Sequence, residues 1–305
     1  MGLFIKRVCL AILAFVLLVS VSLWAMVNIR GRWNEIVLVD IEKRNVVESI
    51  DGNKLVFVGG SNLSYGMDSE RVQDSLGITT YNMGLHAGIG LSYMLYEASQ
   101  YMNSGDVLVL IPEYNQFTRF NGSSALADLL FQSGRFSDFK FYKDWGSYPS
   151  YLCARVFVPF LLKGGNPMID KYADNPKGFN KYGDYVLHLD QPRREFPRLA
   201  MEKRPEPEEI SLIVDRIKAI ETMGVNVVLL PPPYAETSFT LSKEYVDLID
   251  NELKNNGLPF LAETERYSLN DTLFWNSAYH LGAKGRLLRT SMVIEDLRRA
   301  LACDH

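Results

Sequence analysis

The sequence predicts an α/β fold with three layers, in which a central parallel sheet lies between two layers of helices in a flavodoxin-like arrangement. Short apolar runs at residues 54–58, 78–82 and 106–111 alternate with segments of helical periodicity at residues 69–76 and 89–102. Uninterrupted apolar runs are typical of strands that are buried on both faces of a parallel sheet. The alternation therefore favours βαβ units over an all-helical or all-strand fold.

The ends of these elements are marked by residues that stop regular structure. The first apolar run ends at Gly59 and Gly60, and the third run is stopped by Pro112. The helix expected at residues 89–102 has a core face, because apolar residues recur there at helical spacing. These residues are Leu91, Leu95, Ala98 and Met102.

The alternation of apolar runs and helical segments is interrupted between about residues 118 and 207 and then resumes. The interrupted stretch is rich in aromatic residues, glycine and proline, with helical patterns only near residues 125–131 and 151–162. We expect it to be an insertion carried by a sheet domain over residues 54–305. The resumed pattern predicts helices at 208–223, 241–255 and 284–301, and strands at 226–234 and 259–262.

The N-terminus predicts a membrane anchor. Residues 8–29 are uncharged and mostly apolar, and they follow Lys6 and Arg7. About 20 such residues span the hydrocarbon core of a bilayer as a helix. A cleaved signal peptide is the alternative, but Leu23 stands where a small residue would be expected before the 25–26 bond. We therefore expect a single-pass anchor over residues 1–30 and a juxtamembrane helix or linker over residues 31–53.

Charge and cysteine content exclude several classes of function. The formal net charge is −4, which gives no basic surface for nucleic acid. Cys9, Cys153 and Cys303 show no metal-ligand spacing, although Cys153 and Cys303 could pair if the fold brings them together. No metal or organic cofactor is expected.

Polar residues follow the expected strands at the points where these strands end. Ser61 follows the first strand and Gly84 follows the second. Asn115 follows the third strand, and His280 comes just before the last helix. Open α/β sheets place their sites at the carboxyl ends of strands, where a serine nucleophile requires a base and donors for an oxyanion. The alternative is that Ser61 or Asn62 only caps the next helix.

Three short motifs resemble the SGNH/GDSL hydrolase superfamily: GGSN at 59–62, NMG at 82–84 and YHLGAKG at 279–285. The likeness covers about residues 54–118 and 210–300. It is nearest to a membrane-anchored subgroup that includes the D-alanine transfer protein and alginate acetylation proteins, and the FNKYGD segment at 179–184 also resembles that subgroup.

The resemblance implies an SGNH-hydrolase fold and an acyl-ester enzyme, either an O-acyltransferase or an esterase. It implies a cell-envelope polysaccharide or other acylated glycan as substrate and a membrane-bound O-acyltransferase as a partner. The soluble domain is then expected on the extracytoplasmic side of the cytoplasmic or inner membrane.

The resemblance assigns roles by position. Ser61 matches the nucleophile, His280 matches the base, and Gly84 matches the oxyanion glycine. The usual GxND motif is replaced by PEYN at 112–115, so Asn115 or Asn62 is the candidate side-chain donor. Near them, Glu113, Tyr114 and His86 are expected to lie at the pocket or to pack beside it.

The triad acid is the largest departure from the family pattern. Asn276 stands where the anchored relatives have an aspartate, four residues before His280, and an asparagine cannot stabilise an imidazolium as a carboxylate does. Asp271 and Asp184 are the other candidates for the acid or orienting residue. The lack of a carboxylate at position 276 also favours an alternative function, a non-catalytic protein that keeps the fold and binds a glycan or an acyltransferase.

Overall fold

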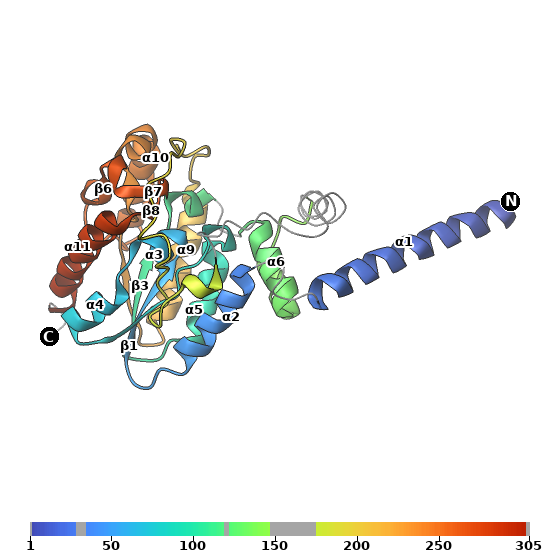
Figure 1. The fold of residues 1–305 in the computed structure, drawn as a ribbon, viewed down its shortest axis with the longest axis horizontal. Helices are drawn as coiled ribbons and strands as arrows, with labels where there is room; N and C mark the ends of the chain where they lie inside the picture. Colours follow the sequence, from blue (N-terminus) through green and yellow to red (C-terminus); the bar gives the residue numbers. More distant parts are fainter. Residues whose placement is uncertain (1, 29–34, 119–121, 147–174, 303–305) are drawn as a thin grey trace.

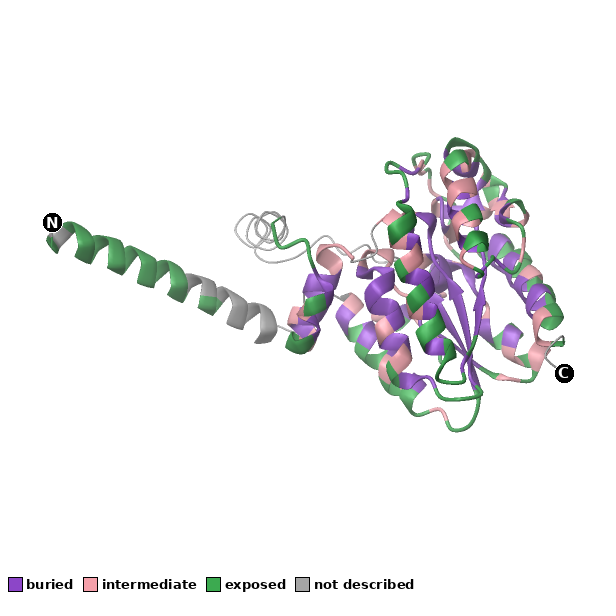
Figure 2. Ribbon diagram, turned by 180° about the vertical axis from the view of Figure 1, so that it is seen from behind, coloured by how far each residue is buried: buried purple, intermediate pink, exposed green. Residues whose placement is uncertain are grey.

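A parallel four-stranded sheet forms the centre of the molecule. The computed structural model describes residues 2–28, 35–118, 122–146 and 175–302. The strands are β1 (Lys54–Gly59), β2 (Thr79–Asn82), β3 (Val107–Ile111) and β4 (Asn226–Leu229), in the order β2-β1-β3-β4. All three pairings are parallel, and the strands lie in the buried interior (Figure 2). The predicted α/β class with a central parallel sheet is confirmed.

Helices cover both faces of this sheet because its strands alternate their side chains between two cores. Leu55 and Phe57 of β1 pack in one core with α4 (Ser69–Leu76) and α11 (Ala283–Ala302). Val56 and Val58 pack in the other core with α2 (Glu35–Glu48), α5 (Leu91–Tyr101) and α9 (Pro207–Glu221). Figure 1 shows the two helical layers on either side of the strands.

The structure differs from the prediction after β4. The expected long strand at residues 226–234 is divided into β4 and β5 (Tyr234–Ala235), and β5 pairs with β6 (Ser268–Leu269) away from the main sheet. The consecutive prolines at 231–233 lie at this division, and proline cannot donate a ladder hydrogen bond. The expected strand at 259–262 is wrong, although the Leu261 amide donates to the Leu229 carbonyl at 2.8 Å.

The other segments near the C-terminus are short strands and two long helices. Helix α10 (Glu236–Asn255) begins earlier than expected, and 3-10 turns η6 (Thr264–Tyr267) and η7 (Asp271–Leu273) follow it. Strands β7 (Phe274–Ser277) and β8 (His280–Leu281) form an antiparallel hairpin immediately before α11. This hairpin carries the histidine predicted as the base.

The N-terminal segment forms a long helix, α1 (Gly2–Asn28), which projects away from the sheet domain (Figure 1). Within the described residues, no helix is both long and apolar enough to cross a membrane. The anchor therefore stays a prediction. The segment expected to be a juxtamembrane helix or linker contains α2, whose Val37 and Val47 belong to the main core.

The described part of the predicted insertion combines short helical elements with a long stretch that has no regular secondary structure, residues 192–206. It contains α6 (Ser124–Ser133), η3 (Phe136–Phe141) and η5 (Pro176–Gly178). Before it, η1 (Ala87–Ile89) follows β2 and η2 (Tyr114–Thr118) follows β3. The helix expected at 151–162, Cys153 and Cys303 lie outside the described residues.

Candidate active site

Ser61 lies at the junction between β1 and the short helix α3 (Ser61–Gly66). The two preceding glycines let this junction approach the end of β3. A Cβ at Gly59 would come within 2.4 Å of the Ile111 carbonyl oxygen, and a Cβ at Gly60 within 2.7 Å of Glu113 Oε1. The GGS sequence therefore allows the Ser61 hydroxyl to lie beside the residues that follow β3.

His280 comes from the β7–β8 hairpin and reaches Ser61 across the chain. Its Nε2 lies 2.9 Å from Ser61 Oγ, and its Nδ1 lies 2.8 Å from Asn276 Oδ1. The Tyr65 ring stacks on the imidazole, with ring centroids 4.2 Å apart and an angle of 15° between the planes. These contacts hold the ring in the orientation that a general base for Ser61 requires.

Burial keeps the imidazole uncharged. Desolvation, with smaller effects from the nearby His188 and His86, lowers the pKa of His280 to about 3. Asn276 orients the ring but brings no negative charge to offset the cost of an imidazolium. His280 can therefore accept a proton at neutral pH, but it is a weaker base than a histidine backed by a carboxylate.

Glu113 is the third side chain at Ser61. Its Oε1 lies 2.9 Å from Ser61 Oγ and accepts from the Asn62 amide at 3.1 Å. Gln116 fixes its backbone, because the Glu113 amide donates to Gln116 Oε1 at 2.9 Å. The side chain is buried, and desolvation raises the pKa of Glu113. Sequence reasoning placed Glu113 only near the pocket, whereas the structure brings it into contact with Ser61.

Gly84, the predicted oxyanion glycine, lies where the chain after β2 passes close beneath α3. A Cβ on it would lie 2.3 Å from the Cβ of Leu63, so the glycine is required there. Its amide donates to Asn82 Oδ1 at 2.8 Å. The amide is therefore already bound in this structure, and its role in oxyanion binding stays a prediction.

The two candidate asparagines differ in their positions. Asn62 Nδ2 donates to the Ile111 carbonyl at 3.1 Å, and its Oδ1 accepts from Arg289 at 3.0 Å, so this side chain ties α3 to β3 and α11. The Asn62 side chain is therefore structural, while its backbone amide donates to Glu113 at the site. Asn115 does line the cavity beside Ser61.

Neither predicted carboxylate acts on His280. Asp184 accepts from Ser69 Oγ at 2.7 Å and from Asn82 Nδ2 at 2.8 Å, while Asp271 accepts from the Thr237 amide at 3.1 Å. Both aspartates therefore have structural partners on other elements. Of the three candidates, Asn276 alone hydrogen-bonds the ring of His280.

A cavity of about 230 Å³ opens beside the nucleophile. Most of the residues that line it have polar side chains: the lining is Ser61, His86, Ala87, Gly88, Glu113, Asn115, Gln116 and Ser123. A second cavity of about 210 Å³ is lined by Asn115, Thr118, Leu199, Ala200, Glu202 and Lys203. Because Asn115 lines both, the two cavities lie next to each other.

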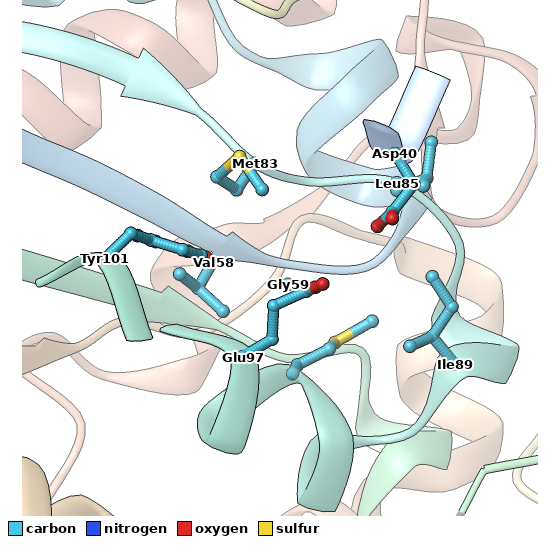
Figure 3. Close-up of a pocket in the computed structure, with 9 residues that line it drawn as sticks. Asp40, Val58, Gly59, Met83, Leu85, Ile89, Glu97 and Tyr101 are labelled. Carbon is cyan, nitrogen blue, oxygen red and sulfur yellow. The ribbon is translucent and has the colours of Figure 1, made fainter. Parts of the chain in front are cut away.

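A third cavity, of about 10 Å³, lies on the α5 side of β1 and is just large enough for one water molecule. Figure 3 shows its lining, which includes Asp40, Gly59 and Glu97. Arg44 and Arg135 pair with these two carboxylates. We refer to Asp40, Arg44, Glu97 and Arg135 as the charge cluster.

The described residues contain no group of three or more histidine, cysteine, aspartate or glutamate side chains that could hold a metal ion. The side chains in contact at the site are Ser61, His280 and Glu113. The sequence contained signals for two residues of the site, Tyr65 and Glu113. Tyr65 follows Ser61 by four residues on one helix, and Glu113 follows the strand that neighbours β1.

Comparison with known proteins does not identify a family for this chain. No protein-family model matches the chain. No curated protein matches it either. What the fold and site define is a class: an α/β protein with a serine–histidine pair at the carboxyl edge of a parallel sheet.

Proposed function

We propose that the chain is a membrane-anchored, SGNH-like acyl-ester enzyme that acts on an acylated cell-envelope polysaccharide. The observation that carries the proposal is the contact of 2.9 Å between Ser61 Oγ and His280 Nε2, with His280 Nδ1 bound to Asn276. This is the geometry of a nucleophile, a base and a group that orients the base.

The arrangement of the sheet supports the proposed SGNH-like, flavodoxin-like fold. The order β2-β1-β3-β4 follows the 2-1-3-4 order of such doubly wound sheets, and ligands bind there at the carboxyl ends of the strands near the switch point. Ser61 follows β1 and Glu113 follows β3, the two neighbouring strands at that edge.

The proposed reaction has two steps. Ser61 Oγ attacks the ester carbonyl carbon while His280 Nε2 takes the hydroxyl proton. The tetrahedral intermediate then collapses, and His280 returns this proton to the departing alcohol, which leaves an acyl-serine. An acceptor hydroxyl then repeats the sequence in reverse: a sugar hydroxyl makes a transferase, and water makes an esterase.

The cavities support a polar, extended substrate. The 230 Å³ cavity offers imidazole, amide and hydroxyl groups, which suit a sugar or a small polar acyl group better than a long aliphatic chain. The neighbouring cavity at Asn115, Glu202 and Lys203 gives room for the next sugar unit. In this proposal α1 anchors the protein with its domain outside the cytoplasmic or inner membrane, beside a membrane-bound O-acyltransferase.

The test is labelling of the full chain, in detergent, with a fluorophosphonate probe, followed by peptide mass spectrometry. We expect modification of Ser61, and we expect it to disappear in Ser61→Ala and His280→Ala. Ser291→Ala, which changes an exposed serine of α11, is the matched control and should label like wild type. Labelling that survives His280→Ala unchanged would contradict the role of His280.

A second candidate function is a non-catalytic glycan-binding or acyltransferase-partner protein. The observation that favours it is the uncharged Asn276 behind His280, where a carboxylate would strengthen the base. A folded wild-type protein that resists the probe but binds an envelope polysaccharide in calorimetry would support this function over the enzyme.

A further inference from the structure

The hydrogen bonds at Ser61 require more protons than Ser61 itself supplies. Its Oγ lies 2.9 Å from Glu113 Oε1 on one side and 2.9 Å from His280 Nε2 on the other. Each of these hydrogen bonds contains one hydrogen, and the serine hydroxyl has only one. The second hydrogen must therefore come from either Glu113 or His280.

The hydrogen bond at Nδ1 of His280 determines which of the two groups supplies the second hydrogen. His280 Nδ1 faces Asn276 Oδ1 at 2.8 Å, and an amide oxygen only accepts, so Nδ1 carries a hydrogen. A neutral imidazole then has a lone pair at Nε2 and accepts the hydroxyl hydrogen of Ser61. The hydrogen between Ser61 and Glu113 consequently belongs to Glu113.

The other arrangement would place an imidazolium and a carboxylate on either side of Ser61. Burial opposes both charges, since it lowers the pKa of His280 to about 3 and raises the pKa of Glu113. The buried cation that interacts with Glu113 is Arg289, but it donates to the Asn62 carbonyl at 2.9 Å and to Asn62 Oδ1 at 3.0 Å. Asn276 is uncharged. The neutral pair is therefore the favoured state.

Glu113 also lies where an oxyanion would form. Its Oε1 is bound by the Asn62 amide at 3.1 Å and is in contact with the nucleophile. A carboxylate in this place would repel the charge that develops on a substrate oxygen. A carboxylic acid would instead donate a hydrogen bond to that oxygen, as buried neutral carboxylic acids do in some other enzymes.

We propose that Glu113 is a carboxylic acid in the resting site and that it is the side-chain oxyanion donor, a role that the resemblance had assigned to an asparagine. This inference rests on the proposed function. When the ester enters, the hydroxyl of Glu113 turns from Ser61 to the carbonyl oxygen. Ser61 Oγ bonds to the carbonyl carbon, its proton moves to His280 Nε2, and the carbonyl π pair becomes the oxyanion that Glu113 binds. Glu113 keeps its own proton throughout.

The experiment measures the rate of fluorophosphonate labelling of the full chain across the range from about pH 5 to pH 9. Wild type should slow as pH rises through the raised pKa of Glu113, because the donor is lost. Glu113→Gln keeps an N–H donor that cannot ionise, so it should stay within about tenfold of wild type and lose this alkaline decline. Glu113→Ala should be slower by about 10²- to 10³-fold.

The opposite pattern would overturn the inference. A wild-type rate that increases as Glu113 ionises, with Glu113→Gln as slow as Glu113→Ala, would make Glu113 a base and not a donor. An infrared difference spectrum between wild type and Glu113→Gln measures protonation without any reaction. A protonated-carboxyl band in wild type supports the inference, and its absence at neutral pH overturns it.

These measurements separate the two levels of the proposal. If folded wild type is not labelled at any pH, the proposed acyl-ester activity fails, and with it the donor role of Glu113. If wild type is labelled at Ser61 but the pH profiles of wild type and Glu113→Gln coincide, the acyl-ester activity stands and the inference about Glu113 fails.

Discussion

Two regions of this protein, on either side of the end of β1, bury ionisable side chains. They differ in whether these side chains form ion pairs. In the charge cluster, Glu97 binds Arg44 at 2.7 Å and Arg135 at 3.0 Å, and Arg135 also binds Asp40. In the candidate site, His280 and Glu113 contact Ser61, and neither forms an ion pair with another described residue.

The difference separates groups that hold the structure from groups that are available for chemistry. Burial and the nearby Asp40 raise the pKa of Glu97 to about 8, while two arginines oppose this rise. In the candidate site, burial is the largest influence on both groups: it lowers the pKa of His280 to about 3 and raises the pKa of Glu113. Ser61 and Glu113 line the 230 Å³ cavity, where a substrate can reach them, whereas Asp40 and Glu97 are held by their arginine partners.

Removal of the shared cation should have the largest effect. Arg135→Leu leaves Asp40 and Glu97 buried without their common partner, and we expect a loss of about 3–5 kcal/mol in the free energy of unfolding. Denaturant unfolding of the full chain measures it. Lys254→Met, which breaks the exposed pair with Asp250, is the matched control and should change little. A near-neutral result for Arg135→Leu would show that the cluster is not held by its ion pairs.

Introduction of a charge behind His280 should make the candidate site resemble the charge cluster. Asn276→Asp gives the imidazolium a counter-charge, which raises the pKa of His280 from about 3 toward its ordinary 6.5 and makes it a stronger base. We expect labelling of Ser61 about 10–100 times faster at neutral pH. Because the base must be neutral, the rate should now fall as pH decreases through the raised pKa.

Asp271→Asn is the matched control for this variant. Asp271 binds the Thr237 amide and not His280, so the labelling rate and its pH profile should stay as in wild type. A rate increase that is equal in both variants, or a decrease in Asn276→Asp, would show that Asn276 does not control the base.

The pH dependence of stability is expected to involve the buried His188, whose Nε2 lies 2.9 Å from the Leu281 carbonyl oxygen and whose ring packs edge-on against Tyr65. Burial lowers its pKa from 6.5 to about 4. The unfolded chain therefore binds a proton that the folded protein does not, and stability is lost as pH falls below 6.5. Relative to His188→Gln, wild type should lose up to about 1.4 kcal/mol of unfolding free energy per pH unit between pH 6.5 and 4. Parallel slopes for the two proteins would exclude this titration.

Most of the sheet could be predicted, and most hydrogen-bond partners could not. The runs that form β1 and β3 are apolar, and β2 is rich in β-branched and aromatic residues. All three are bounded by glycine, proline or polar residues, so the local pattern located them. The strand expected at 259–262 was wrong because a short apolar run pairs or fails to pair according to its neighbours. Asp184 and Asp271 looked like candidate acids, but each is used by a partner that is distant in sequence.

The sequence by itself determined the α/β class and the placement of Ser61 at a strand end, since apolar periodicity and the glycine pair at 59–60 act locally. Only the tertiary structure decided that Gly84 packs beneath α3 and that Glu113 meets Ser61. The physical reason is that a hydrogen bond depends on positions within a few tenths of an ångström. Those positions are set by the packing of elements that lie far apart in the chain.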